Sequence, residues 1–167
     1  MAEERVVTKV EIRPAVIEDA AIIHRFITDL AIYEKAEHEM LASISEIETS
    51  IFGSESTVNG LICLLKGEAI GFAIYFYNYS TWLGKNGLFL EDLYVMPEHR
   101  GIGAGKQLLQ HLAKIAVSKN CGRFEWNVLD WNEPALDFYA SLGAKQQEEW
   151  IGHRLEGEAL LALARSS

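Results

Sequence analysis

The sequence has few of the features that mark membrane, disulfide-bonded or nucleic-acid-binding proteins. No apolar run among its 167 residues reaches the roughly 18–20 residues that a membrane span needs. Its two cysteines, Cys63 and Cys121, lie in apolar, strand-like surroundings without CxxC or Cys/His spacing, so both are predicted to be buried, reduced thiols. The net charge is −9, whereas a groove that holds duplex DNA is usually basic, which argues against nucleic acid as a partner.

Other absences bound the location and the domain organisation. The N-terminal stretch MAEERVVTKVEIRP is charged and lacks the apolar core of a signal peptide, so we expect a cytoplasmic protein. The chain has no long linker, low-complexity tract or internal repeat, and we expect residues 1–167 to form a single domain. The five histidines are scattered without partners at ligand spacing, so we assign no metal site.

Hydrophobic periodicity predicts an α/β protein in the order β-α-α-β-β-β-α-β-α-β-β. The predicted strands are Val10–Arg13, Val58–Leu65, Ala69–Tyr77, Leu88–Met96, Phe124–Leu129 and, in the tail from Lys145 to Leu163, two more around Gly152. The predicted helices are Glu18–Lys35, Ser45–Phe52 with Ser43 or Ser45 as its cap, Gly103–Lys119, and a short one capped by Asp130 or Asn132. A meander followed by strand-helix-strand units indicates a mixed sheet with helices on both faces.

A glycine-rich turn, Arg100-Gly-Ile-Gly-Ala-Gly105, joins a predicted strand to a predicted helix. The first N–H groups of a helix have no internal acceptor and suit phosphate oxygens. Glycines let the backbone approach a diphosphate closely, while Arg100 and Lys106 add cationic donors. The P-loop pattern GxxxxGK[ST] and the dinucleotide pattern GxGxxG both fail here. A turn that binds nothing is the alternative, but three glycines would weaken the helix start by about 1 kcal/mol each relative to alanine.

Taken together, these motifs resemble the GNAT family of N-acetyltransferases. The family's pyrophosphate motif, [R/Q]-x-x-G-x-[G/A], is met by Arg100, Gly103 and Gly105. The quoted segments that carry a closer resemblance, to the diamine (spermidine/spermine- and thialysine-type) acetyltransferases, are YSTW (79–82), LEDLYVMP (90–97), VLDWN (128–132), FY (138–139) and LGA (142–144). The resemblance extends from Ile12 to Ala144 and is strongest from Tyr79 onward.

This resemblance implies the GNAT fold, whose central mixed sheet is mostly antiparallel, and acetyl-CoA as the acetyl donor. It also implies that the strand before the glycine turn splays from its neighbour, so that the pantetheine arm lies in the gap. The residues expected to contact this cofactor are Leu93, Tyr94, Val95, Arg100, Gly101, Ile102, Gly103, Ala104, Gly105, Lys106, Asn132, Glu133 and Pro134.

The expected reaction moves an acetyl group from a thioester to a neutral primary amine. By resemblance, Tyr139 is the proton donor to the departing thiolate, since a phenol with a pKa near 10 is protonated at neutral pH. Glu91 matches the family residue that draws the proton from the substrate ammonium. Strand alternation predicts that Glu91 and Asp92 point to opposite faces. An internal salt bridge is the alternative role for this acidic pair.

The expected acceptor is a small diamine, a polyamine or a lysine-like amine such as thialysine. Tyr33 and Glu34 match a family pair that recognises the far charge of the substrate, and Trp82 could pack on its stem or over its cation. Two alternatives stay open: a different acceptor, such as an amino acid, an aminoglycoside or a protein N-terminus, and a non-catalytic acyl-CoA sensor. The resemblance and the apolar tail 159-ALLALA-164 favour a homodimer.

Overall fold

The computed structural model describes residues 7–166. The chain divides into two compact units, the first ending at Asn127 and the second beginning at Val128. The first unit contains β1 (Glu11–Pro14), α1 (Ala20–Tyr33), α2 (Ile44–Phe52), β2 (Val58–Leu65), β3 (Glu68–Ser80), β4 (Lys85–Val95), α3 (Ala104–Ser118) and β5 (Phe124–Trp126). The second contains α4 (Glu133–Ser141) and α5 (Gly157–Arg165). Residues 1–6, on which part of the expected location depends, lie outside the described residues.

The sheet of the first unit follows chain order, β1-β2-β3-β4-β5. Strands β1 to β4 are antiparallel neighbours, and β5 alone runs parallel to β4. A two-residue loop joins β2 to β3, in which Lys66 (φ 50°) and Gly67 (φ 82°) are both left-handed. That conformation matches the right-handed twist of the flanking strands. The predicted mixed, mostly antiparallel sheet is confirmed.

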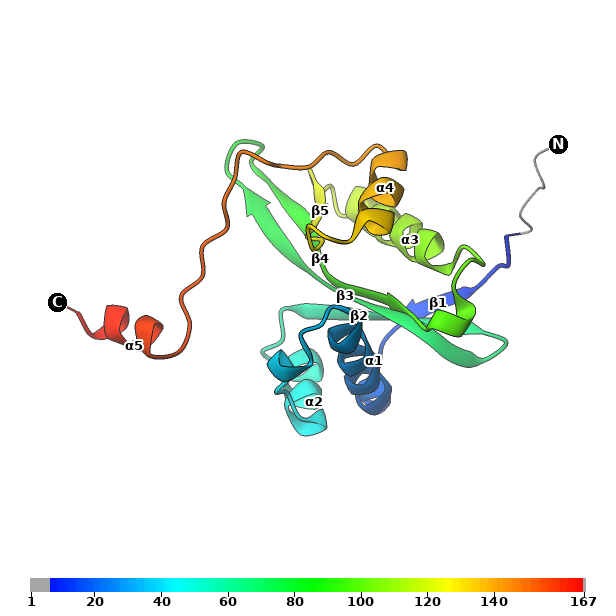
Figure 1. The fold of residues 1–167 in the computed structure, drawn as a ribbon, viewed down its shortest axis with the longest axis horizontal. Coiled ribbons are helices and arrows are strands. Elements are labelled where there is room, and N and C mark those ends of the chain that lie inside the picture. Colours follow the sequence, from blue (N-terminus) through cyan, green and yellow to red (C-terminus); the bar gives the residue numbers. More distant parts are fainter. Residues whose placement is uncertain (1–6, 167) are drawn as a thin grey trace. The chain divides into compact units, whose positions relative to one another are not determined.

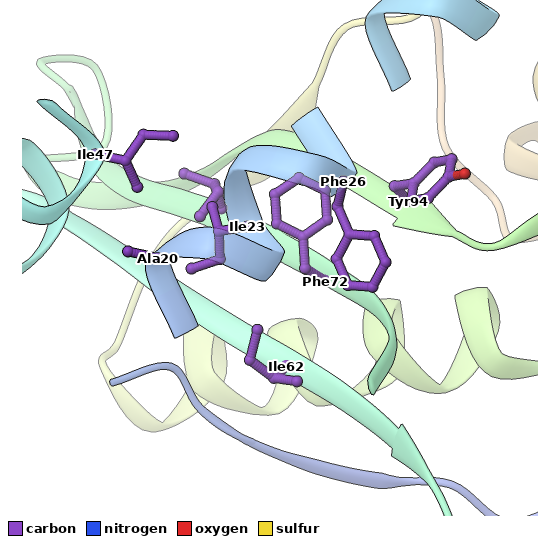
Figure 2. Packing of buried hydrophobic residues seen from close by; sticks show 8 residues of the cluster. Ala20, Ile23, Phe26, Ile47, Ile62, Phe72 and Tyr94 are labelled. Atoms are coloured by element: carbon purple, nitrogen blue, oxygen red, sulfur yellow. The ribbon is translucent and has the colours of Figure 1, made fainter. Parts of the chain in front are cut away.

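Helices cover both faces of this sheet, as predicted. Figure 1 shows α1 and α2 on one side and α3 on the other. The core beneath α1 and α2 is drawn in Figure 2, where Phe26 of α1 lies beside Phe72 of β3 with ring centroids 5.7 Å apart. The eight buried residues of this core are Ala20, Ile23, Phe26, Ile47, Ile62, Phe72, Ile74 and Tyr94. On the other face α3 buries Leu108 and Leu112 completely, so β3 is buried on both sides.

Local polar contacts fix where the two helices of the α1 side begin. Ser43 caps α2, because its hydroxyl accepts from Glu46 N at 3.1 Å while Ser43 N donates to the Glu46 carboxylate at 2.7 Å. Asp19 precedes α1 and accepts from both terminal nitrogens of Arg13 at 2.7 and 2.9 Å, and from Val16 N at 2.8 Å. The end of β1 is thereby tied to the start of α1.

Several predicted boundaries are wrong for identifiable reasons. The predicted loop Asn78–Asn86 is only Thr81–Gly84, because strand pairing continues to Ser80 and resumes at Lys85. After α3 the left-handed residue is Asn120 (φ 55°), not the predicted Gly122. Cys121 lies in this connection and is partly exposed, whereas Cys63 is fully buried in β2.

The tail differs most from the prediction. No strand forms around Gly152 in the described part of the tail, and Gly157–Arg165 forms α5 instead. β5 also ends at Trp126 rather than at Leu129. The run ALLALA consists of strong helix formers, which the alternation argument neglected. Leu160, Leu161 and Leu163 are at least half exposed on α5.

Candidate functional site

The glycine turn presents a row of backbone N–H groups at the start of α3. Gly103 is the N-cap, and the first helical hydrogen bond runs from Gln107 N to Gly103 O at 3.0 Å. Within residues 7–166, the N–H groups from Gly101 through Lys106 have no protein acceptor. Such unpaired donors carry partial positive charge, so this loop is suited to bind an anion.

The three glycines of the turn occupy their positions for different physical reasons. Gly101 (φ 83°) and Gly103 (φ 85°) are left-handed, and the chain reversal itself requires glycine there. Gly105 lies inside the helix with ordinary φ, and a Cβ added to it would meet no described atom within 4 Å apart from its own neighbours and the nearby helix backbone. No contact inside the chain therefore requires Gly105 to be glycine. Its open face is what the close approach of a ligand to the backbone would require.

Arg100 and Lys106 point their charges to different places. Lys106 is exposed in the first turn of α3. The Arg100 side chain turns back over β4, where its Nε donates to Val95 O at 3.0 Å. Its guanidinium carbon lies 5.1 Å from the Tyr33 ring centroid and 5.7 Å from that of Tyr94. Arg100 therefore joins the end of α1 to the end of β4.

Glu91 is the extra residue of a β-bulge in β4. Tyr75 of β3 pairs with Leu90 and its neighbour Ile74 pairs with Asp92, so Glu91 has no partner on β3. The prediction of opposite faces for Glu91 and Asp92 assumed strict alternation, and the bulge breaks that alternation. The pairing instead places Asp92 on the face of Ile74, which packs in the core beneath α1.

Beyond the bulge, the outer edge of β4 is open. β5 pairs with β4 only from Leu88 to Leu90. From Glu91 to Val95, no strand among the described residues pairs with this edge. The predicted splaying of the two strands is thus visible in the pairing itself, because the parallel ladder stops just before the bulge.

The hydrogen-bond pattern shows which groups face the open edge. Met96 N donates to Ile70 O of β3 at 2.8 Å. Because bonded and non-bonded positions alternate in an antiparallel ladder, Leu93 and Val95 point their N–H and C=O groups away from β3. The bond from Arg100 Nε to Val95 O agrees with this direction. Two of the three strand residues expected to contact a pantetheine arm therefore offer backbone groups at the open edge.

Three carboxylates meet where β4 bulges and α1 ends. Asp92 is half-buried, and desolvation, followed by the charges of Glu91 and Glu34, raises its pKa to about 6. Desolvation also raises the pKa of Glu34. Within residues 7–166, Asp92 forms no ion pair or side-chain hydrogen bond. This acidic cluster of Glu34, Glu91 and Asp92 attracts an ammonium group, which would relieve the mutual repulsion.

Trp82 does not join this cluster within one chain. It lies in the loop between Ser80 and Lys85, at the far end of the β3–β4 hairpin, and is 78% exposed. Asp92 lies seven residues after Lys85, the first residue of β4, which corresponds to roughly 20 Å of strand. Within a single chain, Trp82 therefore does not lie beside the acidic pair, where it was expected to pack on the stem or cation of a substrate.

The second unit holds the remaining predicted residues on one helix. Asn132 occupies the N-cap of α4 without a side-chain capping bond, and Glu133 and Pro134 form its first turn. Tyr139 lies two turns further on, half-exposed, with its ring centroid 5.6 Å from that of Phe138. The predicted proline in the first turn is confirmed, and Gly143 beyond the helix has φ 88°.

An open groove of about 420 Å³ runs between α1 and the end of β4. We call it the arginine groove and define it by Arg25, Asp29, Tyr33, Tyr94 and Arg100, all of which line it. Sequence reasoning missed Arg25 and Asp29. Their spacing marks a polar helical face, but only the packing of α1 along β4 shows that this face borders the site.

Comparisons with known proteins define the class. The model of the acetyltransferase (GNAT) family matches residues 24–144. The chain therefore belongs to this family, whose members use an acyl-CoA donor, and it is an acetyltransferase. The fold agrees with an integron cassette protein from V. cholerae, at a TM-score of 0.80 and 29% identity, covering 95% of this chain and 99% of that one.

Two curated relatives indicate which branch of the family the chain resembles. It is 37% identical over 164 residues to a mouse thialysine N-epsilon-acetyltransferase, covering 92% of this chain and 96% of that protein. It is 29% identical over 197 aligned positions to an Arabidopsis thaliana L-ornithine N5-acetyltransferase, covering 91% and 86% respectively. The resemblance predicted from the motifs is confirmed at the level of the family and its diamine-type members. No helix in the described part of the chain is long and apolar enough to span a membrane.

Proposed function

We propose that this protein transfers the acetyl group of acetyl-CoA directly to a primary amine of a small diamine or lysine-like substrate such as thialysine. The observation that carries the proposal is the open edge of β4, flanked by the unpaired N–H groups of the glycine turn and by the acidic cluster. Donor and acceptor sites are then adjacent, because one strand and the loop after it serve both.

The proposed donor site offers a separate group of hydrogen-bonding partners to each part of CoA. The N–H groups from Gly101 through Lys106 hold the diphosphate, and the open face of Gly105 lets its oxygens approach the backbone. Leu93 and Val95 orient the pantetheine arm through their outward N–H and C=O groups. Asn132, Glu133 and Pro134, at the start of α4, are further proposed contacts of the cofactor, by the family resemblance. When bound, acetyl-CoA supplies an acetyl group activated as a thioester.

The chain's own residues then carry out two proton transfers, one from the substrate ammonium and one to the departing thiolate. Glu91 draws a proton from the substrate ammonium, directly or through water, so that the neutral amine can attack. Asp92 and Glu34 keep the ammonium end of the substrate at the bulge by charge attraction. The Tyr139 hydroxyl gives its proton to the departing thiolate. The family model matches residues 24–144, a range that includes parts of both units.

We also propose that the enzyme works as a homodimer in the cytoplasm. The exposed leucines of α5, Leu160, Leu161 and Leu163, support an association, because an apolar helix face gains stability when it is covered. Sedimentation equilibrium of the whole chain and of a variant with these three leucines changed to glutamine tests this part. A monomer at micromolar concentration would contradict it.

The test of the function is an amine panel with acetyl-CoA, in which released CoA is measured for thialysine, lysine, ornithine, putrescine and spermidine. We expect turnover with at least one of them. Calorimetric titration of acetyl-CoA accompanies the panel. Tight binding of acetyl-CoA without turnover on any amine would support a non-catalytic sensor instead. Turnover only on peptide N-termini or aminoglycosides would show that the proposed acceptor class is wrong.

A further inference from the structure

The acidic cluster and the arginine groove both lie where α1 packs along β4, and residues next to the cluster in sequence, Tyr33 and Tyr94, line the groove. Electrostatic coupling places Glu34, at the C-terminal end of α1, near Asp92. It places Asp29 and Arg25, further back on α1, near Tyr94. Helix and strand therefore run in opposite directions, so that going along β4 from the bulge one meets first the acidic cluster and then the groove residues Asp29 and Arg25.

The spacing along α1 suits a lysine-like molecule. At a rise of about 1.5 Å per residue, Asp29 lies about 7.5 Å along the helix from Glu34, and Arg25 about 6 Å beyond Asp29. The five bonds from a side-chain amine to the α-carbon of lysine or thialysine span about 6 Å when extended, for bond lengths of about 1.5 Å. With its reactive amine at the acidic cluster, such a substrate would place its α-carbon level with Asp29.

The groups at the far end match an α-amino acid. Arg25 Nε and Asp29 Oδ2 form only a loose ion pair at 3.8 Å, so both retain hydrogen-bonding capacity for a ligand. Arg100 engages the described residues through its Nε and the face of its guanidinium, which leaves its terminal nitrogens available. An arginine matches the planar carboxylate and Asp29 matches the α-ammonium.

The mixed charge of the groove argues against two other ligands. A polyamine has only cationic groups, and Arg25 would repel its distal ammonium. A phosphate group of the cofactor would be repelled in this groove, because the carboxylates of Asp29 and Glu98 line it and disfavour a dianion. An ammonium and a carboxylate held on one carbon satisfy both signs of charge.

We propose that the arginine groove binds the α-carboxylate and α-ammonium of an amino-acid substrate, with Arg25 on the carboxylate and Asp29 on the ammonium. The enzyme therefore prefers diamino acids to polyamines. This inference rests on the proposed function, because it names the substrate class of the same site.

The matched substrate pair is thialysine and bis(2-aminoethyl) sulfide, which is the same molecule without its carboxylate. Arg25→Gln should lower kcat/KM for thialysine about tenfold or more, since a hydrogen bond to a charged group is lost. It should leave kcat/KM for the sulfide diamine unchanged or higher. Arg25→Lys should restore part of the loss. Asp29→Asn should lower kcat/KM for both substrates, because each of them carries a distal ammonium that Asp29 would bind.

Arg123→Gln is the control, because Arg123 is exposed immediately before β5 and does not line the groove. Equal effects of Arg25→Gln on both substrates, no effect on either, or a change confined to the KM of acetyl-CoA would overturn the inference. So would a wild-type preference for the sulfide diamine, which leaves the proposed function intact.

A binding measurement separates the two failures. If the wild type acetylates neither these two amines nor any other amine of the panel, the proposed function falls. Thermal-shift titration with lysine and cadaverine then still decides the role of the groove. We expect lysine to stabilise the wild type more than cadaverine does, and Arg25→Gln to abolish the difference. Equal shifts from the two amines in the wild type would refute the groove's role independently of catalysis.

Discussion

Replacing Asp92 by asparagine should stabilise the unliganded protein at neutral pH. The folded protein raises the pKa of this carboxyl from 3.8 to about 6, chiefly by desolvation. The folded state therefore binds the proton more tightly than the unfolded state, and stability falls as pH rises between these two values. Asparagine carries no charge at any of these pH values, so the variant avoids the free-energy cost of burying an ionised carboxylate.

The magnitude follows from the two pKa values. One pKa unit corresponds to about 1.4 kcal/mol, so the full penalty is about 3 kcal/mol, of which about 2 kcal/mol develops between pH 4.5 and pH 7.5. For a chain of this length, the difference in Tm between the variant and the wild type should grow by about 4–8 °C over this interval. Comparing the same two proteins at both pH values cancels any effect of the amide on packing.

The assay is thermal unfolding followed by circular dichroism at pH 4.5, 6.0 and 7.5, with the exposed Asp130→Asn as the matched control. Asp92→Asn should also lower kcat/KM for the amine, because one negative charge of the acidic cluster is lost. A Tm difference that is constant with pH, or larger at pH 4.5, would refute the claim that desolvation raises the pKa of Asp92. Stabilisation combined with full activity would show that Asp92 plays no part in amine binding.

Four further changes test other parts of the structure. Tyr139→Phe should lower kcat at least about tenfold with unchanged acetyl-CoA affinity in calorimetry, and full activity would remove its role as proton donor. Gly105→Ala should raise stability by up to about 1 kcal/mol in urea unfolding and weaken acetyl-CoA about tenfold, whereas unchanged affinity would exclude backbone contact there. The ion pair of Asp19 lowers its pKa, so Asp19→Asn should destabilise by about 1–3 kcal/mol at pH 7 and by less as pH falls below 3.8; the opposite trend would contradict the pairing. Burial raises the pKa of Cys63 to about 11, so a thiol reagent should label Cys121 first in the native state, and rapid labelling of both would contradict the burial.

The sequence alone determined the elements whose signals are local. The β2–β3 hairpin follows from Lys66-Gly67, because two left-handed residues between apolar runs specify a tight turn. The phosphate-type loop follows from Arg100 to Gly105, and the family resemblance from the same motif and its neighbours. In each case a few adjacent residues fix the backbone by their own conformational preferences, so no distant contact is needed.

Only the tertiary structure decided which of these elements form a site. The bulge at Glu91 is a mismatch between two strands and leaves no mark in the β4 sequence alone, so strict alternation could not predict that Leu90 and Asp92 pair with neighbouring residues of β3 and lie on opposite faces. Desolvation by tertiary packing raises the pKa of Asp92, and the charge of Glu34, which lies 58 positions earlier in the chain, adds to the effect. The groove of Arg25 and Asp29 exists because α1 packs along β4. Periodicity specifies the face that a residue occupies within its own element, whereas the packing of elements decides what that face meets.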